Sequence, residues 1–234
     1  MSSAPAWRIA PNRDLLAVAV ADVVAAAITS AVAARGVATV AVPGGSTPRT
    51  VFAQLAARTL PWAQTCFVLG DDRWVAADHP ASNLGMIRGI LRDGPASAAT
   101  LVPMVEGPTT LNADAAAADA RLRALAWPLD LMWLGVGADA HTASLFPGED
   151  YAAAIDPANP RRAMAVTPAM LPPEAPFPRL TMPLSALIDV RALILVATGD
   201  DKRTVLEQAL EGAATPVGRV IAAAQCPVSI HWAA

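Results

Sequence analysis

The chain has 234 residues, of which 54% are hydrophobic, and its formal net charge is −3. This length suits one α/β domain, so we expect residues 1–234 to fold as a single unit. The near-neutral charge without a basic block argues against nucleic acid or a membrane surface as a partner. An anionic ligand would therefore have to be held by a few placed cations.

An apolar segment near the N-terminus, residues 15–34, could pass for a signal peptide or a membrane span. Asp22 interrupts it, and an ionised carboxylate near a bilayer centre costs about 2.5–3.5 kcal/mol. Asn12 offers a helix cap, and Arg35-Gly36 is a natural helix stop. We therefore predict a helix packed on the sheet of a cytoplasmic protein.

Short apolar runs alternate with alanine-rich helical stretches along the chain. The predicted strands are VATVAV at 37, CFVLG at 66, LDLMWLG at 129, ALILVATG at 192 and PVSIHW at 227. This alternation predicts an α/β fold, an open, doubly wound, mostly parallel sheet with helices on both faces, whose ligands gather where strands end. The proline-rich stretch 157–183 is expected to be an extended loop. The isolated cysteines Cys66 and Cys226 are expected to be buried and reduced.

The turn PGGSTP at residues 43–48 follows a predicted strand and opens a helix. Its two glycines let the backbone approach a ligand, and the helix amides favour an anion such as phosphate. Ser46 or Thr47 could cap the helix, with Pro48 in its first turn. A tight turn needing glycine for geometry alone is the open alternative.

Two carboxylates and a guanidinium, Asp71, Asp72 and Arg73, directly follow the strand CFVL, and Ser82-Asn83 comes ten residues later. This is unusually polar for a place so near the core. An exposed turn with a local ion pair, worth at most about 1 kcal/mol, is the alternative.

The segment LGVGADAHTASLFPG follows the strand beginning at Leu129, and it contains one of only three histidines. Asp139 lies two residues before His141, and a carboxylate can fix the tautomer of an imidazole that takes a proton from water. A structural histidine is the alternative. No GxSxG elbow surrounds Ser144, so a serine nucleophile is not expected and loss of its hydroxyl should be nearly silent.

Two cations come late in the chain, Arg179 in PRLT and Lys202 in GDDK. Each alone is typical of a solvated surface charge, but together at strand and loop ends they could neutralise a phosphate dianion. No spacing of His, Cys and carboxylates suggests a metal site, and we expect no metal and no cofactor.

Taken together and in this order, these segments resemble the 6-phosphogluconolactonase family. The matching pieces are VPGGSTP, GDDRWV with the later SN, DLMWLGVGADAHTASLFPG, PRLT and GDDK, spread over residues 43–202. The string GADAHTASLFPG is highly specific, whereas related sugar-phosphate enzymes share the GGSTP turn. The resemblance implies a fold akin to the glucosamine-6-phosphate deaminases and a metal-free hydrolase of the oxidative pentose phosphate pathway.

The resemblance also implies roles for individual residues. His141, Asp139 and Arg73 would be catalytic, with a small sugar-phosphate lactone as substrate. The substrate and its phosphate would be bound by Gly44, Gly45, Ser46, Thr47, Asp71, Arg179 and Lys202. We expect a monomer or a weak homodimer.

Three departures from the family pattern stand out. Asp72 replaces the usual glutamate, Ala140 replaces the usual glycine, and residues 168–178 lack a basic residue often found there. If residue 140 needs positive φ, alanine there adds strain of order 1 kcal/mol. Two other functions stay open: a glucosamine-6-phosphate deaminase-like isomerase and a sugar-phosphate-binding protein without turnover.

Overall fold

The computed structural model describes residues 4–171 and 175–234, and within them seven parallel strands form one sheet. In spatial order the strands are β1 (Ala6–Ile9), β10 (Val228–Ala233), β9 (Leu193–Thr198), β6 (Leu131–Gly135), β2 (Ala38–Val42), β3 (Thr65–Leu69) and β5 (Thr100–Val102). The predicted open parallel sheet is confirmed. The edge strands β1 and β5 were not predicted, because they are short and only partly buried.

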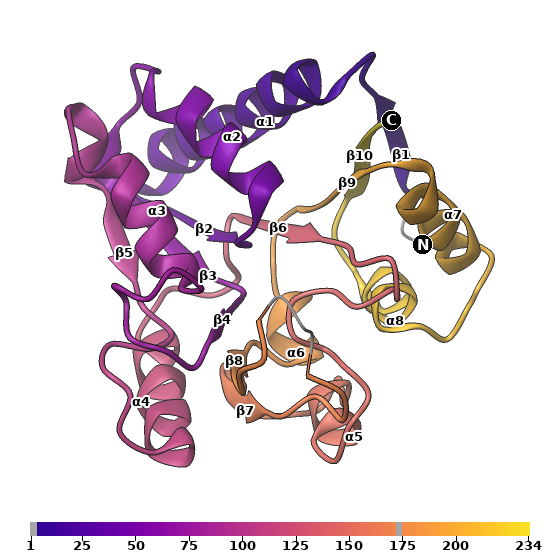
Figure 1. Ribbon diagram of the computed structural model, residues 1–234. Coiled ribbons are helices and arrows are strands. Elements are labelled where there is room, and N and C mark those ends of the chain that lie inside the picture. Colours follow the sequence, from indigo (N-terminus) through magenta and orange to yellow (C-terminus); the bar gives the residue numbers. More distant parts are fainter. Residues whose placement is uncertain (1–3, 172–174) are drawn as a thin grey trace.

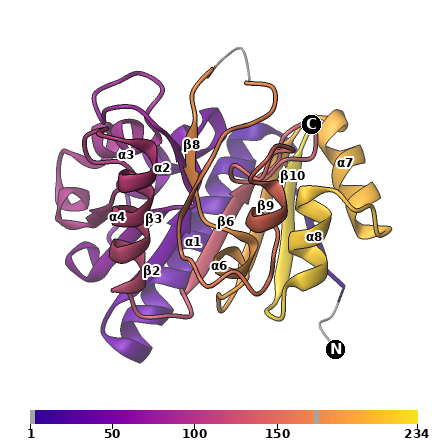
Figure 2. The same cartoon turned by 90° about the horizontal axis from the view of Figure 1, so that it is seen from below.

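Helices cover both faces of this sheet, as predicted. In Figure 1, α1 and α2 lie on one side of the strands while α6 and α8 lie on the other. Figure 2 shows α7 and α8 beside β10, and α3 and α4 toward the opposite edge. The helices are α1 (Arg13–Arg35), α2 (Ser46–Ala56), α3 (Asn83–Leu91), α4 (Leu111–Arg123), α5 (Tyr151–Ala154), α6 (Leu184–Leu187), α7 (Asp200–Leu210) and α8 (Pro216–Ala223), with 3-10 turns at Trp62–Gln64 and Pro95–Ala98.

Helix α1 is long and apolar enough to cross a membrane by length and composition, but it packs on α2 and on the sheet. Its cap and stop are those predicted: the Asn12 side chain accepts the Leu15 N–H at 2.9 Å, and Gly36 has φ 78°. Asp22, within the apolar run, pairs with Arg58 at 2.5 Å. The buried face of α1 therefore covers the sheet of a folded domain.

The strand order reverses between β2 and β6. After β2 the chain adds β3 and β5 on one side, and it then returns to the other side of β2 with β6, β9 and β10. The loops that leave β2 and β6 at their carboxyl ends therefore run in opposite directions. A crevice opens at such a reversal, and it is where ligands bind in open parallel sheets.

A second, antiparallel sheet corrects the prediction of an extended loop over residues 157–183. It consists of β4 (Asp71–Arg73), β8 (Arg179–Thr181) and β7 (Met164–Val166), so two strands lie inside that stretch. The central strand β8 pairs with β7 and with β4, which is about a hundred residues away, and three-residue strands leave no periodic signal. Residues 172–174 of the stretch lie outside the described residues.

Both cysteines are buried and free, as predicted. Burial raises the pKa of Cys66 to about 11. A thiol in such surroundings stays protonated and unreactive at neutral pH.

A buried histidine gives the fold a testable dependence on pH. His231 on β10 is 4% exposed, and burial, helped by the charge of Arg8, lowers its pKa to about 4. Between about pH 4 and pH 6.5, His231 is protonated in the unfolded chain but neutral in the folded chain. The free energy of unfolding therefore falls as the pH falls.

We therefore expect this histidine to cost about 2 kcal/mol of unfolding free energy between pH 7 and pH 5. Urea denaturation of wild type and His231→Gln at both pH values measures it, with the variant losing less than wild type. Equal losses in the two proteins would show that His231 does not resist protonation.

Candidate active site

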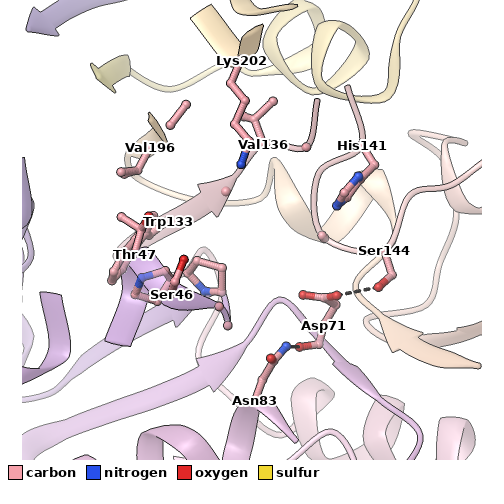
Figure 3. A pocket seen from close by; sticks show the side chains of 18 of the residues that line it. Ser46, Thr47, Asp71, Asn83, Trp133, Val136, His141, Ser144, Val196 and Lys202 are labelled. Carbon is pink, nitrogen blue, oxygen red and sulfur yellow. Dashed lines mark hydrogen bonds between the residues drawn. The ribbon is translucent and has the colours of Figure 1, made fainter. Parts of the chain in front are cut away.

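A pocket of about 240 Å³ lies at the carboxyl ends of β2, β6 and β9, at the reversal of strand order. The small sheet contributes to it through β4 and β8, and α7 contributes Lys202 (Figure 3). Of the predicted site residues, those lining it are Gly44, Gly45, Ser46, Thr47, Asp71, Arg73, His141, Arg179 and Lys202. The fold thus brings together side chains that are up to 158 residues apart in the sequence.

The start of α2 differs from the prediction in a way that favours an anion. The helix begins at Ser46, and its N-cap is Gly45, with φ 108° and no side-chain cap hydrogen bond. The expected cap by Ser46 or Thr47 is therefore wrong, although Pro48 does lie in the first turn. Because no side chain closes this end, its amides remain open toward the pocket.

The glycine before this helix is needed for packing. A Cβ on Gly44 would overlap the side-chain amide of Asn83. Asn83 in turn donates its Nδ2–H to the backbone carbonyl of Asp71 at 3.1 Å. The turn after β2 and the strand β4 are thereby locked together on one side of the pocket.

Three cations reach the pocket from different elements. Arg73 and Arg179 face each other in the register of β4 and β8, and Lys202 lies in the first turn of α7. Arg73 Nη1 donates to the Ala81 carbonyl at 2.7 Å, and Arg179 Nη2 donates to the Ala175 carbonyl at 2.9 Å. Both guanidinium groups are therefore held in place by backbone oxygens, which prepares them for an anionic group.

Asp72, one of the departures, serves the fold rather than the pocket. It is 1% exposed, and its carboxylate accepts the N–H groups of Asn83 at 2.7 Å and Leu84 at 3.1 Å, at the start of α3. Burial raises its pKa to about 6, against the opposing effect of the backbone amides. The shorter side chain thus affects a helix terminus, while Asp71 presents a carboxylate to the pocket.

The predicted histidine–carboxylate pair is present. His141 Nδ1 is hydrogen-bonded to Asp139 Oδ1, and the imidazole points into the pocket (Figure 3). Burial raises the pKa of Asp139, but the hydrogen bond and charge of His141 outweigh it and lower that pKa. Since Nδ1 is engaged, Nε2 is the ring nitrogen left to exchange a proton with a ligand or water.

The loop around this pair leaves no room for side chains at one position. A Cβ on Gly137 would overlap both the imidazole of His141 and the carboxylate of Asp139. The Phe146 ring stacks on the imidazole, with 4.3 Å between centroids. Sequence reasoning gave Phe146 no role, and only its place within HTASLFPG could have pointed to it.

Ala140 has φ 66°, so the positive φ anticipated at this position is confirmed. Its carbonyl accepts the Val217 N–H at 3.2 Å, and its N–H donates to the Gly137 carbonyl at 3.0 Å. These bonds hold Ala140 in the left-handed conformation, which is unfavourable for any residue that carries a Cβ. The loop thus carries strain of order 1 kcal/mol at this residue.

Relief of this strain is measurable. Ala140→Gly is expected to raise the unfolding free energy by up to about 1 kcal/mol, with catalysis retained. The control is Ala138→Gly in the same loop, at a residue with ordinary φ, which should lose about 0.5–1 kcal/mol. Urea denaturation of both variants decides the matter, and destabilisation by Ala140→Gly would contradict the assignment of strain.

Comparison with known proteins places the chain in a family. The model of the family described as glucosamine-6-phosphate isomerases/6-phosphogluconolactonase matches residues 11–232. A 6-phosphogluconolactonase of Mesorhizobium japonicum is 42% identical over 229 residues, which cover 97% of this chain and 94% of that protein. One of Rhizobium meliloti is 39% identical over 230 residues, 96% of this chain and 97% of that protein.

Solved structures agree with the sequence relatives. A 6-phosphogluconolactonase from Shewanella baltica superposes with a TM-score of 0.91 at 32% identity, covering 100% of both chains. A monomeric glucosamine-6-phosphate deaminase shares the fold, with a TM-score of 0.78 at 18% identity over 97% of each chain. This chain belongs to the glucosamine-6-phosphate isomerase/6-phosphogluconolactonase family.

Proposed function

We propose that this chain is a cytoplasmic 6-phosphogluconolactonase, which hydrolyses 6-phospho-D-glucono-1,5-lactone to 6-phospho-D-gluconate in the oxidative pentose phosphate pathway. One observation carries the proposal: His141, which is paired with Asp139, shares a pocket with three cations and an open helix terminus. The similarity to named 6-phosphogluconolactonases over nearly the whole chain supports it. No cofactor is required for this reaction, and the domain would act as a monomer or a weak homodimer.

The phosphate is assigned to the basic side of the pocket. Amides at the start of α2, from Gly45 to Thr47, would donate to its oxygens, and Lys202 would neutralise its charge. Arg179 would supply a second, planar set of donors. Binding there would leave the sugar ring and its carbonyl to the side of the pocket that carries His141.

Hydrolysis of the lactone then needs a general base, a hydrogen-bond donor to the oxyanion and a general acid. Neutral His141 would take a proton from water through Nε2 as the water oxygen attacks the lactone carbonyl carbon. Arg73, fixed by the Ala81 carbonyl, would stabilise the oxyanion. The protonated imidazole would then give its proton to the departing ring oxygen. Asp139 would orient the ring and stabilise its charged form.

An assay with fresh lactone tests the function. Wild-type protein should accelerate hydrolysis well above the spontaneous rate, which is measured in parallel and subtracted. It should release no ammonia from glucosamine 6-phosphate, which separates it from the isomerase alternative. Absence of acceleration, with sugar-phosphate binding retained, would instead support a binding protein without turnover.

The phosphate contacts predict a specific kinetic loss. Arg179→Ala or Lys202→Ala should raise KM for the phosphorylated lactone, with a loss of about 2–3 kcal/mol in transition-state terms. The unphosphorylated lactone should react poorly with wild type and lose little more in either variant. Equal losses on both lactones would show that these cations do not read phosphate.

The base predicts a loss in turnover. His141→Asn should keep the fold and phosphate binding yet lose about 10²–10⁴-fold in kcat, and Asp139→Asn should lose somewhat less. A continuous assay of product formation from pH 5 to 8 measures both variants beside wild type. Near-wild-type turnover by His141→Asn, with the same loss of activity at low pH as in wild type, would show that His141 takes no part in the chemistry.

A further inference from the structure

Ser144 has a buried hydroxyl that the proposed chemistry does not use. The residue is 0% exposed, and its Oγ donates to Asp71 Oδ2 at 2.5 Å (Figure 3). Its backbone N–H donates to Thr181 Oγ1 at 3.2 Å. A serine so enclosed, with its proton given to a carboxylate, is poorly placed to attack a substrate. The role of Ser144 is therefore to be sought in its hydrogen-bond partner, Asp71.

Asp71 is the carboxylate that the pocket presents to a ligand. Its Oδ2 accepts the Ser144 bond, whereas within residues 4–171 and 175–234 no donor is bonded to Oδ1. Its backbone is fixed too, because its carbonyl accepts from Asn83 and it pairs with Thr181 across β4 and β8. A single open acceptor oxygen thus points into the pocket from a rigid support.

The negative charge of the Asp71 carboxylate determines which ligand groups it can bind. An ionised carboxylate only accepts hydrogen bonds, and it repels a phosphate dianion. The ligand groups that suit it are hydroxyls, which a sugar ring carries in number. Asp71 therefore belongs to the sugar end of the pocket, opposite in chemistry to Lys202 and the start of α2.

We infer that Ser144 is a positioning residue for sugar recognition: its hydrogen bond holds Asp71 so that Oδ1 accepts from hydroxyls of the substrate ring. This rests on the proposed function in that the ligand is a sugar phosphate. Without the Ser144 hydroxyl the carboxylate gains rotational freedom and must be ordered again on binding. The cost falls on substrate and transition state alike, so it raises KM and leaves kcat nearly unchanged.

The experiment compares Ser144→Ala with Ser82→Ala. Ser82 is also buried, and its hydroxyl lies 3.4 Å from the neighbouring carboxylate Asp72 and caps α3, away from the pocket. The bond to Asp71 replaces the nearly silent effect expected from the sequence: Ser144→Ala should raise KM for the lactone about tenfold and change kcat less than threefold. Ser82→Ala should lower stability without changing KM. Inhibition by inorganic phosphate should be equal in all three proteins.

Binding of glucose 6-phosphate, measured by calorimetry, gives a readout that needs no turnover. Ser144→Ala should weaken it about tenfold, and Ser144→Cys, which keeps size and a weak donor, should recover part of the loss. In an Asp71→Asn background Ser144→Ala should add less than twofold. If Ser144→Ala does not fold, Ser144→Cys and the single variant Asp71→Asn decide the matter, because each should weaken glucose 6-phosphate binding without changing inhibition by inorganic phosphate.

Two results would overturn the inference. Unchanged KM and unchanged glucose 6-phosphate binding in Ser144→Ala would make the hydroxyl merely structural. A large fall in kcat at constant KM would place Ser144 in the chemistry instead. If wild type failed to hydrolyse the lactone, the proposed function would fall, yet the glucose 6-phosphate comparison would still test Ser144.

Discussion

The reversal of strand order between β2 and β6 is the constraint on which the rest of the structure depends. Every neighbouring pair of strands in the seven-stranded sheet of the described residues is parallel, so the loops after β2, β6 and β9 all leave at one edge. At the reversal these loops diverge and leave a pocket. Backbone amides, cations and the imidazole meet there although no short sequence segment contains them all.

The loop that carries His141 contains strained backbone, and hydrogen bonds to the rest of the fold hold it in place. Ala140 and Ala143 adopt positive φ on either side of His141-Thr142, and each such alanine is strained. Thr142 ties the loop to the Gly135 carbonyl at 2.8 Å, and Ser144 ties it to Asp71. Strain and anchors together fix the direction of the imidazole before any ligand arrives.

Much of the fold could be predicted, because long buried strands and capped helices leave local signals. The five apolar runs are strands of the sheet, and Asn12 and Gly36 bound α1 as expected. The small sheet could not be predicted, since its three-residue strands pair over about a hundred residues. The cap of α2 was also misassigned, because Gly45, Ser46 and Thr47 are all compatible with an N-cap and only the backbone geometry decides.

The candidate site shows the same division. Their positions at strand ends predict that Gly44 to Thr47, Asp71, Arg73 and His141 lie together, and they do. The local pattern alone could not tell which of Asp71 and Asp72 meets the pocket, because adjacent strand residues point to opposite faces and only the register decides; the resemblance is what implied Asp71. The roles of these residues rest on resemblance and remain proposals.

The central claim is that the pocket binds its ligand in one direction, with phosphate at the start of α2 and the reacting carbon at His141. A crystal structure with 6-phosphogluconate bound tests this most directly. We expect the phosphate to lie against the amides of Ser46 and Thr47 and beside Lys202. We expect the product carboxylate against Arg73 and His141, and a hydroxyl of the opened sugar chain on Asp71. The reverse orientation, with the carboxylate at α2 and the phosphate at His141, would contradict it.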